Sequence, residues 1–197
     1  MRIVEMNVYE FSELNDKAKE RARNRWREEY EFSPDLEGVK SIAEILGISD
    51  IDISYAGFSH QGDGASFTGF YSYRANSCSD IRRLAPKDKE LHRIADTLEF
   101  AQNINENKLQ ARIRRSEHRY LHEYTVCIDV HRTDGKDIVY CDVAFDATDD
   151  GLQSFMRWIY KEIQDQYEYS VSDEQIDENF TEIGYEFDRN GNVFVCD

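Results

Sequence analysis

The chain has 197 residues, 40% of them hydrophobic and 13% aromatic, with only two prolines. This composition is typical of a globular protein and excludes a disordered chain, and the length favours one domain over residues 1–197. No apolar run reaches the roughly 18 residues that a membrane span needs, and the formal net charge of −16 gives a surface that repels nucleic acid and membranes.

The first fifty residues predict a strand and two helices. Alternating polarity over residues 3–11 indicates a half-buried strand where a signal peptide would have an apolar block, so we expect a soluble, cytoplasmic protein. Asn15 is a suitable N-cap for a first helix with a narrow apolar stripe, which consists of Ala18, Ala22, Trp26 and Tyr30. A second helix follows Pro34 and ends at Gly47.

The middle of the chain alternates strands with one helix. Residues 51–58 and 66–74 are predicted to form two strands joined by a glycine-rich connection. A helix is expected from about Pro86, with Leu91, Ile94, Ala95, Leu98 and Ala101 on its buried side. A strand follows, in which Leu109, Ala111 and Ile113 face the core.

A hairpin is predicted over residues 124–145, because Asp134-Gly135 is a strong signal for a two-residue turn. Pairing across this turn places Val130 opposite Val139, Ile128 opposite Cys141, and Val126 opposite Val143, so that one face is wholly apolar. Cys127 and Cys141 then lie on opposite faces, and no disulfide is expected between them.

The last fifty residues predict two helices and a second hairpin. A long helix is expected from about Asp149 to Tyr169, followed by a short helix whose capping box is Ser172 with Gln175 and whose apolar positions are Ile176, Phe180 and Ile183. A turn at Asn190-Gly191 closes the chain. The irregular order of elements favours the α+β class, with a largely antiparallel sheet with hairpins packed against about four to five helices.

The glycine-rich connection reads "GFSHQGDGASFTGF". Its spacing does not fit a phosphate-binding loop, and Gly62 and Gly64 around Asp63 are what a tight turn requires. The main interpretation is a turn, with two alternatives: recognition of a partner by His60, Gln61 and Asp63, or acid–base chemistry by His60 with Asp63.

The segment "RIRRSEHRYLH" concentrates positive charge in an acidic protein. It is the best candidate for contact with phosphate or nucleic acid, through Arg112, Arg114, Arg115 and Arg119. The alternative is that this basic strand balances the acidic end of the chain. His118 and His122 have a spacing that suits a metal only on a helix, and no third ligand is nearby, so no metal site is predicted.

Acidic residues are concentrated near the carboxyl end. Residues 134–197 contain 17 acidic and 4 basic residues, which leaves only a small excess of acidic residues in the first 133 positions. One interpretation is a solubilising face, and the other is an acidic face that occupies a basic groove on another protein. The residues assigned to this partner-binding face are Asp165, Glu168, Asp173, Glu174, Asp177 and Glu178.

No motif of a known catalytic class is present, and the four cysteines are scattered without a C-x-x-C pair. We therefore expect free thiols, no cofactor and no metal. The sequence favours a binding protein over an enzyme, and it leaves open whether the protein is a monomer or a homodimer.

Four stretches together resemble a family of small bacteriophage and mobile-element proteins, some of them labelled antitoxin-like: "VYEFSELNDKAKERARNRWREEY", "GFSHQGDGASFTGFYSY", "APKDKELHRIADTL" and "YEYSVSDEQIDENFTEIGYEF". The resemblance implies a phage accessory protein that acts in a bacterial host cytoplasm against a host defence or toxin protein. The acidic end of the chain adds the expectation that this partner is inhibited through a basic surface. The alternative is a nucleic-acid-binding regulator that uses the basic strand around residues 112–119.

Overall fold

A computed structural model describes residues 7–116 and 120–194. The chain divides into two compact units: unit 1 comprises residues 1–34 and 165–197, and unit 2 comprises residues 35–164. The described residues form six α-helices, a four-stranded antiparallel sheet and a two-stranded sheet, which confirms the predicted α+β class. Among these residues, no helix is both long enough and apolar enough to cross a bilayer.

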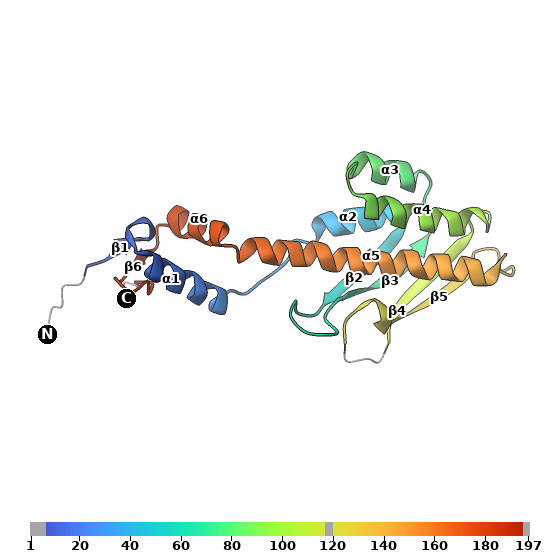
Figure 1. Ribbon diagram of the computed structural model, residues 1–197. Helices are drawn as coiled ribbons and strands as arrows, with labels where there is room; N and C mark the ends of the chain where they lie inside the picture. The colour runs from blue at the N-terminus through green and yellow to red at the C-terminus, as the bar shows by residue number, and fades with distance from the viewer. Residues whose placement is uncertain (1–6, 117–119, 195–197) are drawn as a thin grey trace. The chain divides into compact units, whose positions relative to one another are not determined.

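Unit 2 is built on an antiparallel sheet of four strands in chain order. The strands are β2 (Ile48–Tyr55), β3 (Ala65–Ser72), β4 (Leu109–Arg115) and β5 (Val126–Arg132). The helices are α2 (Glu37–Leu46), α3 (Ser77–Leu84), α4 (Lys89–Asn103) and α5 (Cys141–Ser170), the last of which continues into unit 1. Helices α4 and α5 cross one face of the sheet (Figure 1), where the Phe67 ring meets that of Phe155 edge to face.

Local signals in the sequence explain where these helices begin and end. The Asp88 carboxylate accepts a hydrogen bond of 2.9 Å from the Leu91 amide and so caps α4. Gly47 ends α2 with a φ of 87°, and a Cβ there would lie 2.1 Å from the carbonyl oxygen of Ser72. Only glycine satisfies both conditions, so the predicted end of this helix is confirmed.

Unit 1 joins the two ends of the chain. It contains β1 (Tyr9–Glu10), α1 (Asp16–Glu29), α6 (Asp173–Ile183) and β6 (Glu186–Phe187), and β1 pairs with β6. The predicted caps are present, since the Asn15 side chain accepts from the Ala18 amide and the Ser172 hydroxyl accepts from the Gln175 amide. Of the predicted strand over residues 3–11, positions 3–6 lie outside the described residues, only Tyr9–Glu10 form a strand, and Phe11–Glu13 form a turn of 3-10 helix.

The predicted hairpin over residues 124–145 is wrong. β5 pairs with β4, so Val130 lies opposite Ala111 and Ile128 opposite Ile113. The chain leaves the sheet after the Asp134-Gly135 turn, because the Asn105 side chain binds both the amide and the carbonyl of Val139, at 2.8 and 3.1 Å. Helix α5 then begins at Cys141, well before the predicted start near residue 149.

Two smaller points also differ from the sequence prediction. Helix α3 was not expected, and it brings the number of α-helices to six among the described residues. Of the apolar positions predicted on the short helix, Ile176 and Phe180 are buried, but Ile183 is 65% exposed. The turn at Gly191 is present, with a φ of 85° and a bridge between Phe187 and Val193, although the strands that flank it are very short. The single-domain prediction stays a prediction, because compactness does not show whether two units unfold together.

Candidate functional site

The six acidic residues assigned to a partner-binding face have different environments. Asp177 receives two hydrogen bonds from Arg23 of α1, with 2.7 Å between Arg23 Nε and Asp177 Oδ1. Asp173 forms ion pairs with Arg23 and Arg27. The bond to Asp177 raises the pKa of Arg23, as expected for a cation held by a carboxylate. These two aspartates therefore hold α6 against α1, and arginines balance their charges.

The other side of α6 carries the acidic surface. Glu174 and Glu178 are exposed and form no ion pair with any described residue, and Glu182, which the sequence analysis missed, continues the same series. Residues spaced by four lie above one another on a helix, so the three carboxylates form one row along α6. We call Glu174, Glu178 and Glu182 the α6 glutamate row. Asp165 and Glu168 are also exposed, but they belong to the last turns of α5.

Charge differs between the two units. Unit 1 contains 18 acidic and 8 basic residues, a formal net charge of −10, whereas the larger unit 2 contains 22 and 16, a net charge of −6. The acidic excess over residues 134–197 is thus divided between them, since residues 134–164 belong to unit 2.

The glycine-rich connection between β2 and β3 is organised by one carboxylate. Asp63 Oδ2 accepts hydrogen bonds from the amides of Ser59 and His60, at 2.9 and 2.7 Å, and Gly62 has a φ of 98°. This bonding supports the interpretation of the loop as a turn, because Asp63 is occupied in shaping the backbone. The His60 side chain is 84% exposed, and its Nδ1 lies 3.8 Å from Asp63 Oδ2.

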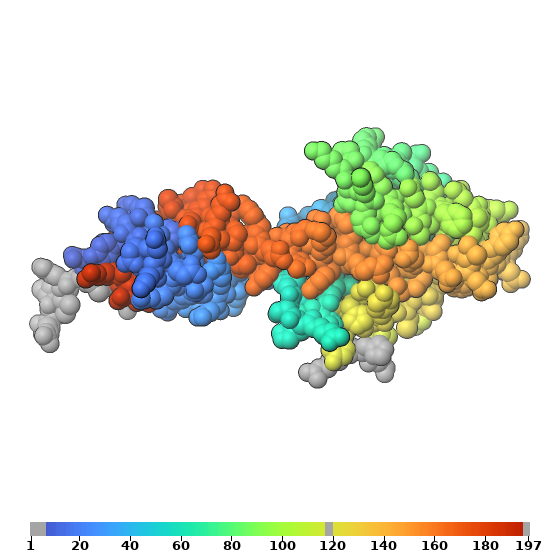
Figure 2. Space-filling model, in the orientation of Figure 1, coloured from blue at the N-terminus to red at the C-terminus, as the bar shows by residue number. Residues whose placement is uncertain are grey.

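A second segment packs beside this loop. A Cβ on Gly64 would lie 2.6 Å from the Cβ of His122, and one on Gly62 would contact the Tyr120 ring. In Figure 2 the loop around residues 57–64 and the segment near residue 120 lie side by side. The small residues of this loop are therefore explained by close packing, and His122 lies here because its ring accepts from the Tyr124 amide.

The arginine side chains of the basic strand are only partly available for contact with phosphate or nucleic acid. Arg112 lies over the exposed Phe70 ring, 5.8 Å from its centre, Arg114 pairs with Asp129, and Arg115 donates to the hydroxyl of Ser54. Arg119 and His118 lie outside the described residues. The structure therefore brings Arg112 and Arg114 to the face of the sheet that the helices leave uncovered. Of these two arginines, Arg114 has its charge balanced by Asp129.

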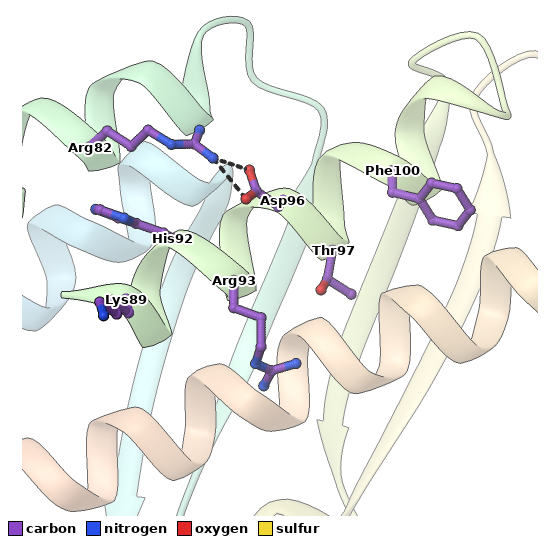
Figure 3. A pocket seen from close by; sticks show the side chains of 7 residues that line it. All are labelled: Arg82, Lys89, His92, Arg93, Asp96, Thr97 and Phe100. Atoms are coloured by element: carbon purple, nitrogen blue, oxygen red, sulfur yellow. Dashed lines mark hydrogen bonds and ion pairs between the residues drawn. The ribbon is translucent and has the colours of Figure 1, made fainter.

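The outer side of α4 forms a shallow groove that sequence reasoning missed. Its volume is about 570 Å³, and Figure 3 shows the seven side chains that line it, which are Arg82, Lys89, His92, Arg93, Asp96, Thr97 and Phe100. Arg82 binds Asp96 with both distances at 2.7 Å. Arg93 is held by Glu90 and Asp150, which raises its pKa.

Lys89 lies between this groove and a second hollow of about 650 Å³, which is also lined by Lys87, Arg157, Trp158 and Lys161. Trp158 donates its indole N–H to Asp88 at 2.8 Å. Among the described residues that line the first groove, Lys89 is the one Lys or Arg side chain without an ion pair. The groove can therefore accept one anionic group near Lys89 and an apolar group against Phe100, which is 50% exposed. The sequence signal was the recurrence of polar residues three and four apart on the outer side of this helix.

One set of described side chains has the composition of a metal site, namely Cys78, Asp96 and Glu99, whose ligand atoms lie within 4.8 Å of one another. Burial, together with the carboxylates of Glu99 and Asp96, raises the pKa of Cys78 to about 12. A metal ion would have to remove this proton and displace Arg82 from Asp96. The buried thiol and the Arg82–Asp96 pair therefore disfavour a metal ion at these side chains.

A model of a protein family described as a domain of unknown function, DUF8835, matches residues 32–173. The match includes all of unit 2 and ends at the first residue of α6, so the α6 glutamate row lies beyond it. Neither the curated proteins nor the solved structures include a match to the chain.

Proposed function

The chain belongs to the DUF8835 family of domains of unknown function, and we propose that it is a binding protein whose α6 glutamate row docks on the basic surface of a partner protein. The observation that carries this proposal is that the acidic residues of α6 fall into two groups. Asp173 and Asp177 bind arginines of α1, while Glu174, Glu178 and Glu182 face solvent.

The geometry of α6 supports docking by charge. Carboxylates one turn apart are about 6 Å apart, so the row presents negative charge at regular intervals over two turns. The pairs of Arg23 and Arg27 with Asp177 and Asp173 fix the rotation of α6 about its axis, so little ordering is needed on binding. Such a row favours a partner with basic residues at similar spacing, including a groove that otherwise binds a nucleic-acid backbone.

The partner class follows from this chemistry and from the resemblance to phage and mobile-element proteins. We propose a host defence or toxin protein whose basic groove is blocked without any catalytic step, in the cytoplasm of a bacterial host. Inhibition by occupation requires no cofactor and no active site in this chain.

The test is capture of partners from bacterial lysate by the full chain, compared with two triple variants. Glu174→Lys, Glu178→Lys and Glu182→Lys together should abolish capture. The control combines Glu28→Lys, Glu31→Lys and Glu186→Lys, which are exposed glutamates of unit 1 without an ion pair to any described residue. Both variants change the net charge equally, so only a local effect of α6 separates them.

Salt gives a second criterion. A complex formed through the α6 glutamate row should be retained in about 50 mM salt and lost in about 500 mM, because screening shortens the range of these charges. Capture that resists salt, or that both triple variants reduce equally, contradicts the proposal.

Nucleic-acid binding by the basic strand is a second candidate, and one observation favours it. Arg112 lies over an exposed aromatic ring on the uncovered face of the sheet, an arrangement on which single-stranded bases can stack. Gel shifts with DNA and RNA at about 50 mM salt test it, because phosphate-driven binding is strongest there. The absence of a shift, or a shift that Arg112→Ala leaves unchanged, eliminates this candidate.

A further inference from the structure

The two edges of the four-stranded sheet differ. At one edge, β2 is interrupted by a bulge between Ser49 and Asp52, and Asp50 has a φ of 51°. At the other edge, β5 pairs with β4 over seven residues without a bulge or a proline (Figure 1). Bulges and charged residues protect the edge of a sheet from pairing with another strand, whereas the unpaired backbone groups of a regular edge can bind one. Only the β2 edge is protected by a bulge.

The hydrogen bonds at both ends of β5 show which backbone groups face outward. Ser116 donates to the carbonyl of Thr125, and Thr133 donates to that of Lys108, at 3.0 and 2.9 Å. Hydrogen-bonded positions alternate along an antiparallel ladder, so residues 127, 129 and 131 bond to β4. The amides and carbonyls of Val126, Ile128 and Val130 therefore point to the open edge, where no described segment pairs with them.

The side chains beside this edge are apolar. Val126, Ile128 and Val130 are only half-buried on the helix side of the sheet. Val130 packs with Ala144 of α5, and nearby Val139 and Val143 are 44% and 49% exposed. A strand added at this edge would thus cover apolar side chains as well as backbone groups.

We propose that β5 pairs antiparallel with β5 of a second copy of the chain, around a two-fold axis at Ile128. In this register Ile128 lies opposite Ile128 of the partner subunit, and Val126 lies opposite the partner's Val130. All six outward amides and carbonyls of each strand's three residues find partners, so the edge is self-complementary. A two-fold contact of this kind closes on itself and yields a dimer.

Charge disfavours one of the neighbouring registers. On the uncovered face, Asp129 lies opposite the partner's Cys127, and His131 lies opposite the partner's Thr125, so no like charges are directly opposed. A shift that centres the axis on Asp129 would place two carboxylates face to face, which destabilises a pair of strands. The chosen register avoids this cost and keeps the valines and isoleucines together.

The expected association is modest. Strand addition alone buries less than the roughly 1,200–2,000 Å² of a stable interface, so we expect a dissociation constant in the micromolar range. Each copy has a formal net charge of −16, and added salt should strengthen the dimer by screening this repulsion. Salt therefore acts in the opposite direction from its effect on a complex formed by the α6 glutamate row.

Sedimentation velocity of the full chain, from about 1 to 200 μM, tests the proposal with two matched variants. Ile128→Pro removes an outward amide of β5, and proline is tolerated at such a position because no bond to β4 is lost. Ile53→Pro is the control: the bond from the Ala56 amide to the Gly64 carbonyl shows that the Ile53 amide points to the open edge of β2. We expect dimers from the native chain and from Ile53→Pro, and monomers from Ile128→Pro.

Cross-linking provides a readout that leaves the backbone of β5 intact, should Ile128→Pro fail to fold. In the proposed register Cys127 and the partner's Cys127 are diagonal neighbours, about 7–8 Å apart, within reach of a short bismaleimide. With Cys141→Ser and Cys196→Ser in place, the exposed Cys127 should give a covalent dimer. With Cys127→Ser and Ser49→Cys added, which moves the thiol to β2, the reagent should give none.

A native chain that stays monomeric up to 200 μM, or cross-links that form equally from β2, would overturn the proposal. The triple lysine variant of α6 should dimerise like the native chain. Loss of the lysate partner and loss of the dimer are thus separate results.

Discussion

The packing inside unit 1 differs from the packing inside unit 2. Unit 2 is one continuous segment with a four-stranded sheet and buried faces on α4 and α5. Unit 1 has strands of two residues, and its core is an aromatic cluster drawn from both ends of the chain, in which Phe180 meets Phe11 and Phe187 at 5.1 Å between ring centres. Unit 1 therefore depends on contacts between residues far apart in sequence, which bear a larger loop-closure cost.

The ion pairs of the two units also differ in what they connect. In unit 1, Arg23 and Arg27 of α1 bind Asp173 and Asp177 near the other end of the chain, whereas Arg25 pairs locally with Glu29 on the same helix. In unit 2, the buried guanidinium of Arg132 joins Glu106 and Asp134 at the end of the sheet. The comparison indicates that charge holds the chain ends together in unit 1 and fixes a turn in unit 2.

The largest expected effect on stability comes from removing one aromatic ring from the core of either unit. Phe180→Ala should cost about 3–5 kcal/mol, because it leaves a cavity in the aromatic cluster, and Phe155→Ala should cost a similar amount in unit 2. If the units are distinct, hydrogen exchange should show lost protection in unit 1 alone for Phe180→Ala. Loss of protection in both units for either variant would show one cooperative domain, as the sequence analysis expects.

A smaller effect is expected from the ion pairs of unit 1. Arg23→Met should destabilise the protein by about 1–2 kcal/mol, because the Arg23 side chain is only 17% exposed and Asp177 would lose two hydrogen bonds. The control is Arg25→Met, which removes an exposed pair within α1 and should cost about 0.3–0.5 kcal/mol. Urea unfolding measures both, and equal costs would contradict a special role for the pairs that join the chain ends.

Most helices could be predicted from the sequence, because their caps and apolar stripes are local. The stripe from Leu91 to Ala101 is buried as expected, and Asn15 and Gly47 cap helices where the pattern placed them. The departure of the chain from the sheet after β5 could not be predicted, because it depends on Asn105, a residue 34 positions from Val139. A strong turn signal fixes a reversal of the chain, but it does not fix the partner strand.

The candidate site was predicted only in part. Composition identified the acidic end of the chain and included Glu174 and Glu178. It could not separate them from Asp173 and Asp177, because that distinction depends on which side of α6 meets the arginines of α1. Glu182 follows from the spacing of four once the helix is known. The α4 groove depends on Arg82 from α3, a helix that the sequence analysis did not find.

A pH-dependent effect is expected in unit 2. Arg132 donates hydrogen bonds to Asp134 and lowers the pKa of this carboxyl well below its value of about 3.8 in an unfolded chain. The stabilisation is therefore complete above about pH 5 and is lost as the pH falls toward the folded-state pKa. Asp134→Asn should lower stability at about pH 7 and reduce the loss of stability between about pH 5 and pH 3.

Urea midpoints at several pH values check this expectation, with Asp137→Asn as the control. Asp137 is an exposed carboxylate of the same loop and has no ion pair with a described residue. If Asp134→Asn and the native chain lose stability in parallel on acidification, the proposed role of the Arg132 contact is wrong.

The smallest effect is one of thiol reactivity, and it sharpens the comparison between the units. Cys78 is 5% exposed and its pKa is raised to about 12, chiefly by burial, whereas Cys127 and Cys141 are exposed. A thiol reagent at about pH 8 attacks thiolates, so with Cys196→Ser in place it should modify Cys127 and Cys141 quickly and Cys78 only when unit 2 opens. Because Cys78 lies in unit 2, Phe180→Ala in unit 1 should leave its slow rate unchanged, and Phe155→Ala should raise it. A rise with Phe180→Ala would mean that loss of the aromatic cluster opens the sheet and its helices as well.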